Sequence, residues 1–358
     1  MSLLSETISK IQPLDERAMQ TTRERQNQLT KPQGSLGRLE VISVQLAGIS
    51  GRERPRLTRL VIITMAGDHG VALQGVSAYP REVTPQMVLN FLRGGAAINV
   101  LARHVGARVV VVDMGMATDL PPDADLIVKK IAFGTRDFSQ GAAMTRDEAQ
   151  CAVEAGIEVA VREIDRGADM IGTGDMGIGN TTSSSALVAA FTGRPVAEVT
   201  GRGTGVDDAG LARKVAVIER ALQVNRPDPS DALDVLSKVG GFEIGGLAGV
   251  IIGAASKCVP AVIDGFISGA AAMIAYHLAP ATQPYMIAAH RSVEIGHRVV
   301  LEHLKLKPLF DLDLRLGEGT GAALGISLCQ AACKILDEMA TFEEAGVSDK
   351  ATLTKAAL

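Results

Sequence analysis

The stretch RLVIITM, residues 59–65, is an almost unbroken run of apolar residues, several of them β-branched. The polar residues Asp68 and His69 and the turn former Gly70 follow shortly after it. A strand that is apolar on both faces is typical of a parallel sheet with helices packed on either side. We therefore expect residues 59–65 to form a central strand of such a sheet.

Runs of the same kind recur along the chain, and segments with helical spacing, such as 83–104 and 145–167, separate most of them. The other runs are ARVVVVDMG (107–115), ADLIVKKIAFG (124–134), ADMIGTGDMG (168–177), CVPAVIDGF (258–266) and PYMIAAHRS (284–292). Alternating strands and helices predict an α/β fold, a parallel Rossmann-like sheet flanked by helices. Open sheets of this class bind ligands at the carboxyl ends of their strands, so we expect the site there.

Both ends of the chain have a helical pattern without apolar strand runs. We expect residues 1–55 and 305–358 to form together a smaller helical domain, and residues 56–304 to form the large α/β domain with the parallel sheet. In this division the C-terminal part of the smaller domain carries Glu318.

Composition limits the class of partner. A formal net charge of -4 leaves no basic footprint for nucleic acid or for an anionic membrane. The N-terminus lacks the apolar segment of a signal peptide, and Gly269, Pro280 and Pro284 interrupt the longest uncharged stretch, 265–290. We expect a cytoplasmic enzyme with small-molecule substrates.

The ligand clusters typical of metal sites are missing, and so is the P-loop motif. Cys329 and Cys333 could share one helix face, but no histidine or second cysteine pair accompanies them, so we expect them, with Cys151 and Cys258, to be buried thiols. The six histidines show no ligand spacing, and no P-loop motif is present. We expect no metal and no cofactor.

A glycine-rich motif, GTGDMGIGNTTSSSALV at 172–188, allows three interpretations. Gly172, Gly174 and Gly177 match the G-x-G-x-x-G of dinucleotide-binding proteins, although a single match of this kind is weak. Tight packing is the second interpretation. The third, which we favour, is a phosphate-binding turn of another kind. The donors of such a turn would be the backbone of Gly177 and Gly179 and the side chains of Asn180, Thr181 and Thr182.

A second glycine-rich stretch, RLGEGTGAALG at 315–325, places Glu318 where a helix is expected to begin. Such turns usually hold an anion, because free N–H groups and the helix dipole favour negative charge there. A carboxylate would repel a phosphate at this place. Glu318 is therefore either a helix cap or a base held beside an anionic substrate.

Several of these stretches together resemble one family, the nicotinate-nucleotide–dimethylbenzimidazole phosphoribosyltransferases. They are KPQGSLGRLE (31–40), AGDHGV (66–71), GVSAYPREVTPQMVLNFLRGGAAINVLA (75–102), GIGNTT (177–182), DVLSKVGGFEI (234–244) and RLGEGTGAAL (315–324). The resemblance implies transfer of ribose 5-phosphate from nicotinate mononucleotide to 5,6-dimethylbenzimidazole in cobalamin lower-ligand assembly. It also implies a homodimer without a metal, and Glu318 as the general base.

The resemblance further implies a set of substrate-binding residues. Asp175 falls where the family usually has Glu, so its side chain is one methylene shorter. Taken alone, Lys214 and Arg315 would more often be solvated charges. The residues implied to bind substrate are Tyr79, Met87, Asp175, Met176, Gly177, Asn180, Thr181, Lys214, Ser292, Arg315, Leu316 and Gly319.

Two other functions fit parts of the sequence. The glycines at 172–177 would suit a dinucleotide-dependent oxidoreductase. A non-catalytic protein that binds a nucleotide or a benzimidazole would keep the same fold, although the presence of Glu318 argues against it.

Overall fold

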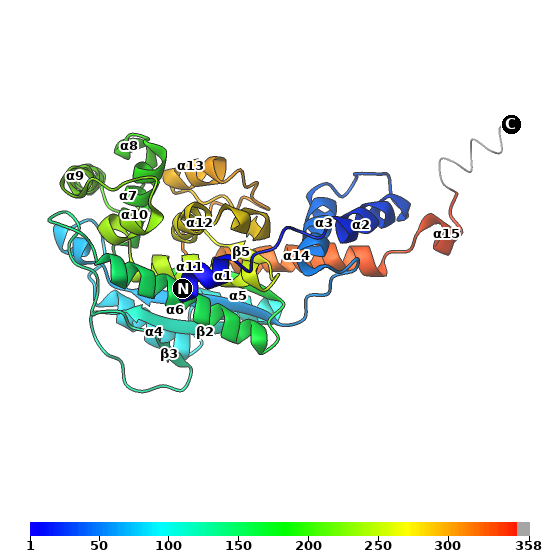
Figure 1. Cartoon of the computed structure of the whole chain (residues 1–358), viewed down its shortest axis with the longest axis horizontal. Coiled ribbons are helices and arrows are strands. Elements are labelled where there is room, and N and C mark those ends of the chain that lie inside the picture. The colour runs from blue at the N-terminus through cyan, green and yellow to red at the C-terminus, as the bar shows by residue number, and fades with distance from the viewer. Residues whose placement is uncertain (349–358) are drawn as a thin grey trace. The chain divides into compact units, whose positions relative to one another are not determined.

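The computed structural model describes residues 1–348, and its centre is one parallel β-sheet (Figure 1). Six strands lie in the order β3-β2-β1-β4-β5-β6, and every neighbouring pair is parallel. The strands are β1 (Leu60–Gly67), β2 (Ala107–Gly115), β3 (Leu126–Val128), β4 (Met170–Met176), β5 (Ala261–Ile263) and β6 (Met286–Ala288). The α/β prediction is confirmed, and each predicted run contains a strand.

The strand order determines where a ligand can bind. β1 is buried along its whole length and pairs with β2 on one side and β4 on the other. The chain builds the sheet outward from β1 in one direction, through β2 and β3, and then in the other direction from β4. This reversal opens a crevice beyond the carboxyl ends of β1 and β4.

Helices cover the sheet, and loops connect them to the strands. They are α1 (Leu3–Ile8), α2 (Glu16–Gln28), α3 (Arg38–Ser50), α4 (Val83–Leu92), α5 (Ala97–Val105), α6 (Arg146–Asp165), α7 (Asn180–Thr192), α8 (Val196–Val199), α9 (Asp208–Asn225), α10 (Ala232–Val239), α11 (Phe242–Ser256), α12 (Phe266–Leu278), α13 (Ile295–His303), α14 (Thr320–Glu338) and α15 (Phe342–Ala345). The predicted helix 83–104 is divided into α4 and α5, because Gly94 takes a φ of 74° between them.

The abundance of glycine has a packing consequence on α6 and α11. A Cβ atom on Gly156 of α6 would lie 1.8 Å from the carbonyl oxygen of Gly246 in α11. The two helices therefore touch through their backbones, which only glycine permits. This close approach explains how a core poor in aromatic residues still packs densely.

Two compact units make up the chain. The larger unit contains Met1–Gln12 and Arg59–Ile326, and the smaller contains Pro13–Thr58 and the chain from Ser327 on. These boundaries differ from the predicted 1–55, 56–304 and 305–358, and they place Glu318 in the larger unit. The reason is backbone pairing: the Arg291 N–H donates to the Phe310 carbonyl at 3.0 Å, and the Val293 N–H to the Leu314 carbonyl at 3.2 Å.

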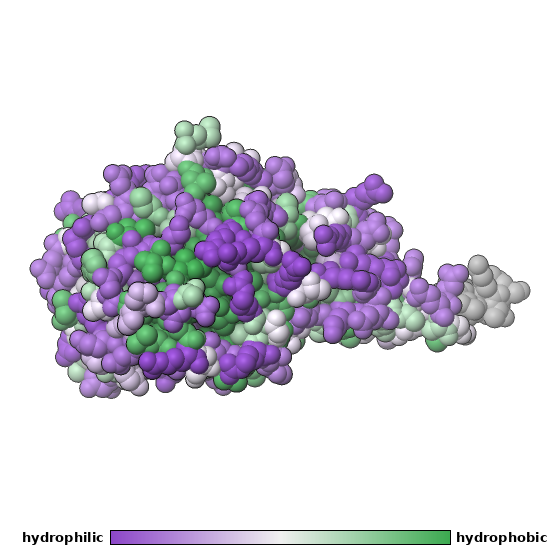
Figure 2. All heavy atoms as spheres, turned by 90° about the horizontal axis from the view of Figure 1, so that it is seen from below, coloured by the Kyte–Doolittle hydropathy of each residue, from purple (hydrophilic) through white to green (hydrophobic). Residues whose placement is uncertain are grey.

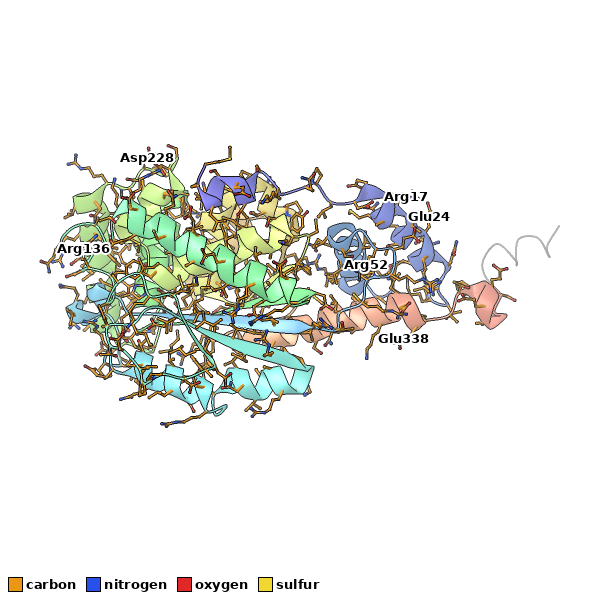
Figure 3. All side chains as sticks on the ribbon, turned by 60° about the horizontal axis from the view of Figure 1, so that its bottom comes forward. Arg17, Glu24, Arg52, Arg136, Asp228 and Glu338 are labelled. Atoms are coloured by element: carbon orange, nitrogen blue, oxygen red, sulfur yellow. The ribbon has the colours of Figure 1, made fainter. Side chains whose placement is uncertain are left out.

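The smaller unit is built from amphipathic helices. Ile42, Leu46 and Leu336 are buried within it. The charged residues labelled on it in Figure 3, Arg17, Glu24, Arg52 and Glu338, are exposed. Burial of one apolar stripe on each helix is what holds such a unit together.

The surface carries mixed polarity. Figure 2 shows hydrophilic residues over most of one face, with apolar residues between them. No helix in the described range is both long and apolar enough to cross a membrane. Cys329 and Cys333 are buried as expected, but the expectation is wrong for Cys151 and Cys258, which are exposed because they lie on outer surfaces of the larger unit.

Candidate active site

A cavity of about 470 Å³ lies at the carboxyl edge of the sheet, within the larger unit. Its wall comes from the end of β4, the starts of α4, α7 and α12, and the segments 203–204, 290–294 and 315–318. Eleven of the predicted site residues line it: Tyr79, Met87, Asp175, Met176, Gly177, Asn180, Thr181, Ser292, Arg315, Leu316 and Glu318. The structure therefore brings together side chains that are separated by more than two hundred residues in sequence.

Glu318 sits in a backbone conformation that side chains rarely adopt. Its φ is 62°, and the flanking Gly317 and Gly319 have φ values of 82° and 99°. Its carbonyl accepts a hydrogen bond from Thr64 Oγ1 at 2.9 Å, and its N–H donates to the Asp175 carbonyl at 3.3 Å. Such strained positions persist only where the surroundings enforce them, and they cluster at functional sites.

The Glu318 carboxylate is held at the beginning of α5. Glu318 is 5 % exposed, and its Oε2 accepts the N–H of Ile98 at 3.2 Å. Burial raises the pKa of Glu318 above its ordinary value, while the Ile98 N–H opposes that rise. A carboxylate with a raised pKa is a better proton acceptor, which suits a general base.

Gly319 does not line the cavity. A Cβ on Gly319 would lie 2.7 Å from Ile62 Cγ2, so this glycine lets the turn pack directly onto the sheet. Direct binding of substrate by Gly319 stays a prediction.

Asp175 is the second carboxylate in the cavity wall. Its Oδ2 accepts a hydrogen bond from Asn180 Nδ2 at 2.9 Å, which orients the amide at the start of α7. Burial, together with the negative charges of Asp264, Glu243 and Glu318, holds the pKa of Asp175 well above its usual range. A buried carboxylate surrounded by other negative charges resists ionisation, so the protonated form of Asp175 is favoured.

The turn at 177–182 connects β4 to α7, and binding of an anion by this turn stays a prediction. Gly179 takes a φ of 99° immediately before α7, and the Ile178 N–H is anchored by Thr84 Oγ1 at 3.1 Å. Asn180 and Thr181 face the cavity. Thr182 is fully buried and is not part of the cavity wall, so it is unsuited to direct contact.

The dinucleotide interpretation fails on geometry. Gly172 and Gly174 lie inside β4, whereas the dinucleotide motif requires its glycines in the turn between strand and helix. A Cβ on Gly174 would lie 2.2 Å from the carbonyl oxygen of Glu318. These two glycines thus serve tight packing against the 317–322 segment.

Lys214 lies behind the cavity wall. Its side chain is fully buried, and Nζ donates to Thr181 Oγ1 at 2.8 Å and to the Gly201 carbonyl at 3.2 Å. Burial lowers the pKa of Lys214 to about 8, with the charge of Glu294 opposing the shift. The interpretation of Lys214 as a solvated surface charge is wrong. Arg315 is exposed and lines the cavity, and its Nη1 donates to the Gly203 carbonyl at 3.2 Å.

Sequence reasoning missed several residues of this wall. Glu294 is 7 % exposed and accepts the Gly203 N–H at 2.9 Å, which holds the loop that closes one side of the cavity. His290 also lines the wall, and His297 lies behind it, where its Nδ1 accepts the Ser292 N–H at 3.0 Å. The signal available for Glu294 was its position two residues after Ser292 at a strand end.

The burial of His297 predicts that acid lowers the stability of the fold. Burial lowers the pKa of His297 to about 3. At a pH below the ordinary histidine pKa, the unfolded chain therefore binds a proton at His297 that the folded chain does not bind. This contribution to stability is present above about pH 6.5 and is lost as the pH falls. When the pH is lowered from 7.5 to 5, the free energy of unfolding of the wild type should fall by about 2 kcal/mol more than that of His297→Gln.

Chemical denaturation of both proteins at the two pH values measures this difference. The exposed His104, substituted in the same way, is the matched control and should behave as wild type. Equal pH dependence in wild type and His297→Gln would contradict the prediction.

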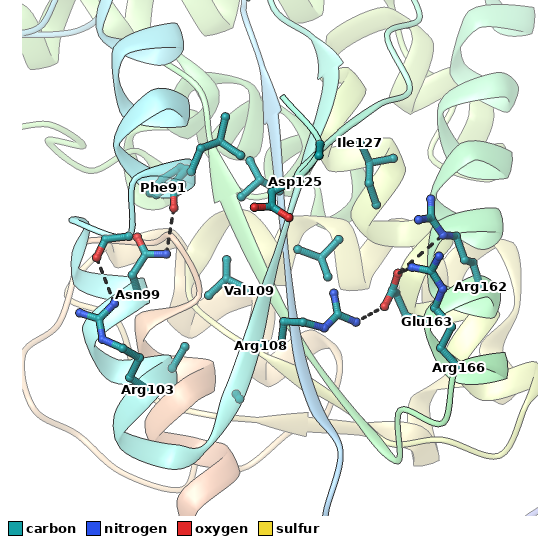
Figure 4. Close-up of a pocket in the computed structure, with 17 residues that line it drawn as sticks. Phe91, Asn99, Arg103, Arg108, Val109, Asp125, Ile127, Arg162, Glu163 and Arg166 are labelled. Carbon is teal, nitrogen blue, oxygen red and sulfur yellow. Dashed lines mark hydrogen bonds and ion pairs between the residues drawn. The ribbon is translucent and has the colours of Figure 1, made fainter. Parts of the chain in front are cut away.

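A second cavity, of about 370 Å³, lies beside the amino-terminal half of β2 and contains none of the predicted site residues (Figure 4). Arg108, Arg162 and Arg166 all contact the buried carboxylate of Glu163 there. The positive charges of these three arginines are therefore partly neutralised by Glu163. Within residues 1–348, no group of three histidine, cysteine or acidic side chains is placed to hold a metal ion.

Comparison with known proteins identifies close relatives. A model of the phosphoribosyltransferase family matches residues 11–347. A nicotinate-nucleotide–dimethylbenzimidazole phosphoribosyltransferase of Roseiflexus sp. is 71% identical over 98% of this chain and 99% of its own length, and one of Desulforudis audaxviator is 62% identical over 97% and 99%. The crystal structure of such an enzyme from Thermus thermophilus matches with a TM-score of 0.89 at 46% identity, covering 94% of this chain and 100% of that one.

Proposed function

Because the chain belongs to the phosphoribosyltransferase family, we propose that it transfers ribose 5-phosphate from nicotinate mononucleotide to 5,6-dimethylbenzimidazole. The products are α-ribazole 5'-phosphate and nicotinate, in lower-ligand assembly for cobalamin. The observation that carries this proposal is Glu318: a buried carboxylate in left-handed backbone, lining a cavity that also contains the glycine-rich turn at 177–182.

The chemistry requires one base and one phosphate site. The bond that breaks joins the ribose C1' to the pyridinium nitrogen of nicotinate, which already carries positive charge and leaves as a neutral ring nitrogen. The bond that forms joins C1' to one benzimidazole nitrogen, and the proton on the other ring nitrogen becomes acidic. Glu318 accepts that proton, a step worth about 100- to 10,000-fold in rate.

The apolar end of the cavity suits the benzimidazole. Val83, Met87, Met176 and Leu316 line it together with Tyr79. An aromatic base of low polarity gains binding energy from burial against such side chains. Tyr79 is 56 % and Leu316 58 % exposed, so these two side chains present apolar surface at the mouth of the cavity.

The polar end of the cavity suits the ribose phosphate. Asn180, Thr181, Ser292 and Arg315 supply donors around the turn that precedes α7. A phosphate in a partly dry site needs several directed donors and at least one full positive charge. Lys214 adds a charge directly behind Thr181 Oγ1.

The test is direct. The purified protein is incubated with nicotinate mononucleotide and 5,6-dimethylbenzimidazole in excess chelator, and α-ribazole 5'-phosphate is measured by chromatography. We expect product without added metal or NAD. Absence of product with folded protein would overturn the proposal in favour of a non-catalytic binding protein.

Lys214→Ala should weaken the binding of nicotinate mononucleotide far more than that of the benzimidazole. Loss of one buried charge beside a phosphate costs about 1.5 to 3 kcal/mol, which is roughly tenfold to a hundredfold in affinity. Calorimetric titration of each substrate measures the effect. The control ligand is nicotinate riboside, which lacks the phosphate; equal losses for riboside and mononucleotide would assign Lys214 a purely structural role.

We also propose that the active form is a cytoplasmic homodimer. The support is the family resemblance, in which the neighbouring chain completes each site. Mass photometry at working concentration tests the oligomeric state, and a monomer with full activity would contradict the proposal.

A further inference from the structure

The glycine-rich turn that carries Glu318 already binds a carboxyl group, and that group belongs to the protein. Asp264 lies just after β5 and is 1 % exposed. Its Oδ1 accepts the N–H of Ala322, in the first turn of α14, at 2.8 Å. The N–H groups of Gly319 and Gly321 also stabilise the same carboxylate.

We propose that Asp264 is a positioning residue for the transfer reaction: its carboxylate binds the start of α14 and thereby fixes the backbone conformation from which Glu318 reaches the cavity. Asp264 does not line the cavity and has no direct role in proton transfer. The inference rests on the proposed role of Glu318 as base.

Three observations carry this assignment. The amides that contact Asp264 belong to residues 319, 321 and 322, so they immediately follow Glu318 in the chain. Glu318 and Gly319 have positive φ angles, and a turn of that kind needs outside contacts to stay in one conformation. The free N–H groups and dipole at the beginning of a helix favour a negative charge, which Asp264 supplies.

The same placement couples the two carboxylates electrostatically. Burial raises the pKa of Asp264 to about 7, the three backbone N–H groups oppose the rise, and the charge of Glu318 adds to it. Repulsion between two charges is mutual, so an ionised Asp264 also favours the protonated form of Glu318. Replacing Asp264 by a neutral side chain should therefore let Glu318 ionise at a lower pH.

Other groups face Asp264 from the elements around it. His290 approaches from the end of β6, because a Cβ on Gly321 would lie 2.7 Å from His290 Nε2 and 2.9 Å from Asp264 Oδ1. Asp175 approaches from the end of β4 and experiences the charge of Asp264. Burial lowers the pKa of His290, so the imidazole is neutral at pH 7 and does not offset either carboxylate.

Asp264→Asn tests the inference with almost no change in shape. The amide keeps one oxygen for the Ala322 N–H, but it is neutral and presents an NH₂ group to the remaining donors. We expect kcat at pH 8 to fall at least tenfold, because small displacements of a base cost large factors in rate. The KM for nicotinate mononucleotide should stay within about threefold, and the acid limb of the kcat profile should move to lower pH.

Asp113→Asn is the matched control. Asp113 is also a buried carboxylate at a strand end, and its Oδ1 accepts the N–H groups of Gly115 at 3.0 Å and Met116 at 2.8 Å. It is not part of the cavity wall. Its substitution should change thermal stability without changing kcat or the pH profile.

The decisive measurement combines the substitution with Glu318→Gln. If Asp264 acts through Glu318, Asp264→Asn should reduce the residual rate of the Glu318→Gln enzyme by less than about threefold. Full additivity, or an unchanged kcat and acid limb in Asp264→Asn alone, would overturn the inference. Should Asp264→Asn not fold, Asp264→Ser carries the same predictions, because its smaller side chain cannot overpack the site.

Failure of this inference is distinguishable from failure of the proposed function. Only the role of Asp264 would be overturned if wild type and Asp264→Asn were fully active while Glu318→Gln had lost most of its turnover. A Glu318→Gln enzyme that turned over within about threefold of wild type would instead overturn the assignment of Glu318 as the base.

Discussion

Glu318→Gln is expected to lower kcat by about 100- to 10,000-fold while both substrates still bind. The loss corresponds to about 3 to 5 kcal/mol of barrier. Gln keeps an oxygen that can accept the Ile98 N–H, and the backbone contacts of residue 318 to Thr64 and Asp175 do not involve the side chain. The substitution therefore removes the basicity of the group and leaves its position unchanged.

Single-turnover kinetics and calorimetric titration separate the two effects. The dissociation constants of nicotinate mononucleotide and 5,6-dimethylbenzimidazole should remain within about threefold of wild type, since no hydrogen-bonding partner is lost. A variant that turns over within about threefold of wild type would show that another group accepts the proton. Residual activity above the uncatalysed rate is expected, because positioning still contributes.

Gly174→Ala is expected to reduce kcat by about 100-fold through displacement of Glu318. A Cβ at this position would lie 2.2 Å from the Glu318 carbonyl oxygen, 2.6 Å from its carbonyl carbon and 2.8 Å from Thr64 Oγ1. Rotating a side chain cannot relieve clashes this short, because two of the three atoms belong to the backbone. The turn must move away from β4, and the Thr64 hydrogen bond must break.

The comparison for Gly174→Ala is Gly141→Ala, at a glycine with open space around it and no positive φ. Gly141→Ala should match wild type in kcat and in melting temperature. Gly174→Ala should lower both, and a crystal structure should show residue 318 displaced from the cavity. Wild-type kcat in folded Gly174→Ala would show that the close packing of β4 against the turn is dispensable.

Strand prediction succeeded because its signal is local. Residues 60–67 are all buried in the structure, and a strand covered on both faces must be apolar on both faces. The helical spacing over 83–104 is confirmed, but the segment forms two helices for a local reason too, since Gly94 and Gly95 stand in the middle of the pattern. The boundaries between the two units depend on contacts that are distant in sequence. Residues 305–326 belong to the larger unit, and part of this segment pairs with residues 288–293.

The site was predictable to the extent that its residues lie in recognisable motifs. Asp175 and Asn180 belong to a glycine-rich stretch at a strand end, Glu318 belongs to one at the start of a helix, and all three line the cavity. The function of Gly174 was not predictable, because a glycine inside a motif fits both a turn and a strand until the strand boundary is known. Glu294 and His297 lie in no motif; the position of Glu294 near Ser292 was its only sequence signal, and His297 is revealed only by its contact to Ser292.

The sequence by itself determined the α/β class, the edge of the sheet where the cavity lies, and the glycine-rich turn in which Glu318 stands. These follow from periodicity, from turn residues and from motif content, all of which are properties of short segments. The tertiary structure alone decided the surroundings of the Glu318 carboxylate, whose pKa is raised by burial. Ile98 in α5 binds the carboxylate, Thr64 in β1 binds the backbone carbonyl of Glu318, and Asp264 after β5 binds the start of α14. The physical reason is that burial and hydrogen bonding depend on which distant segments meet, and no local pattern contains that information.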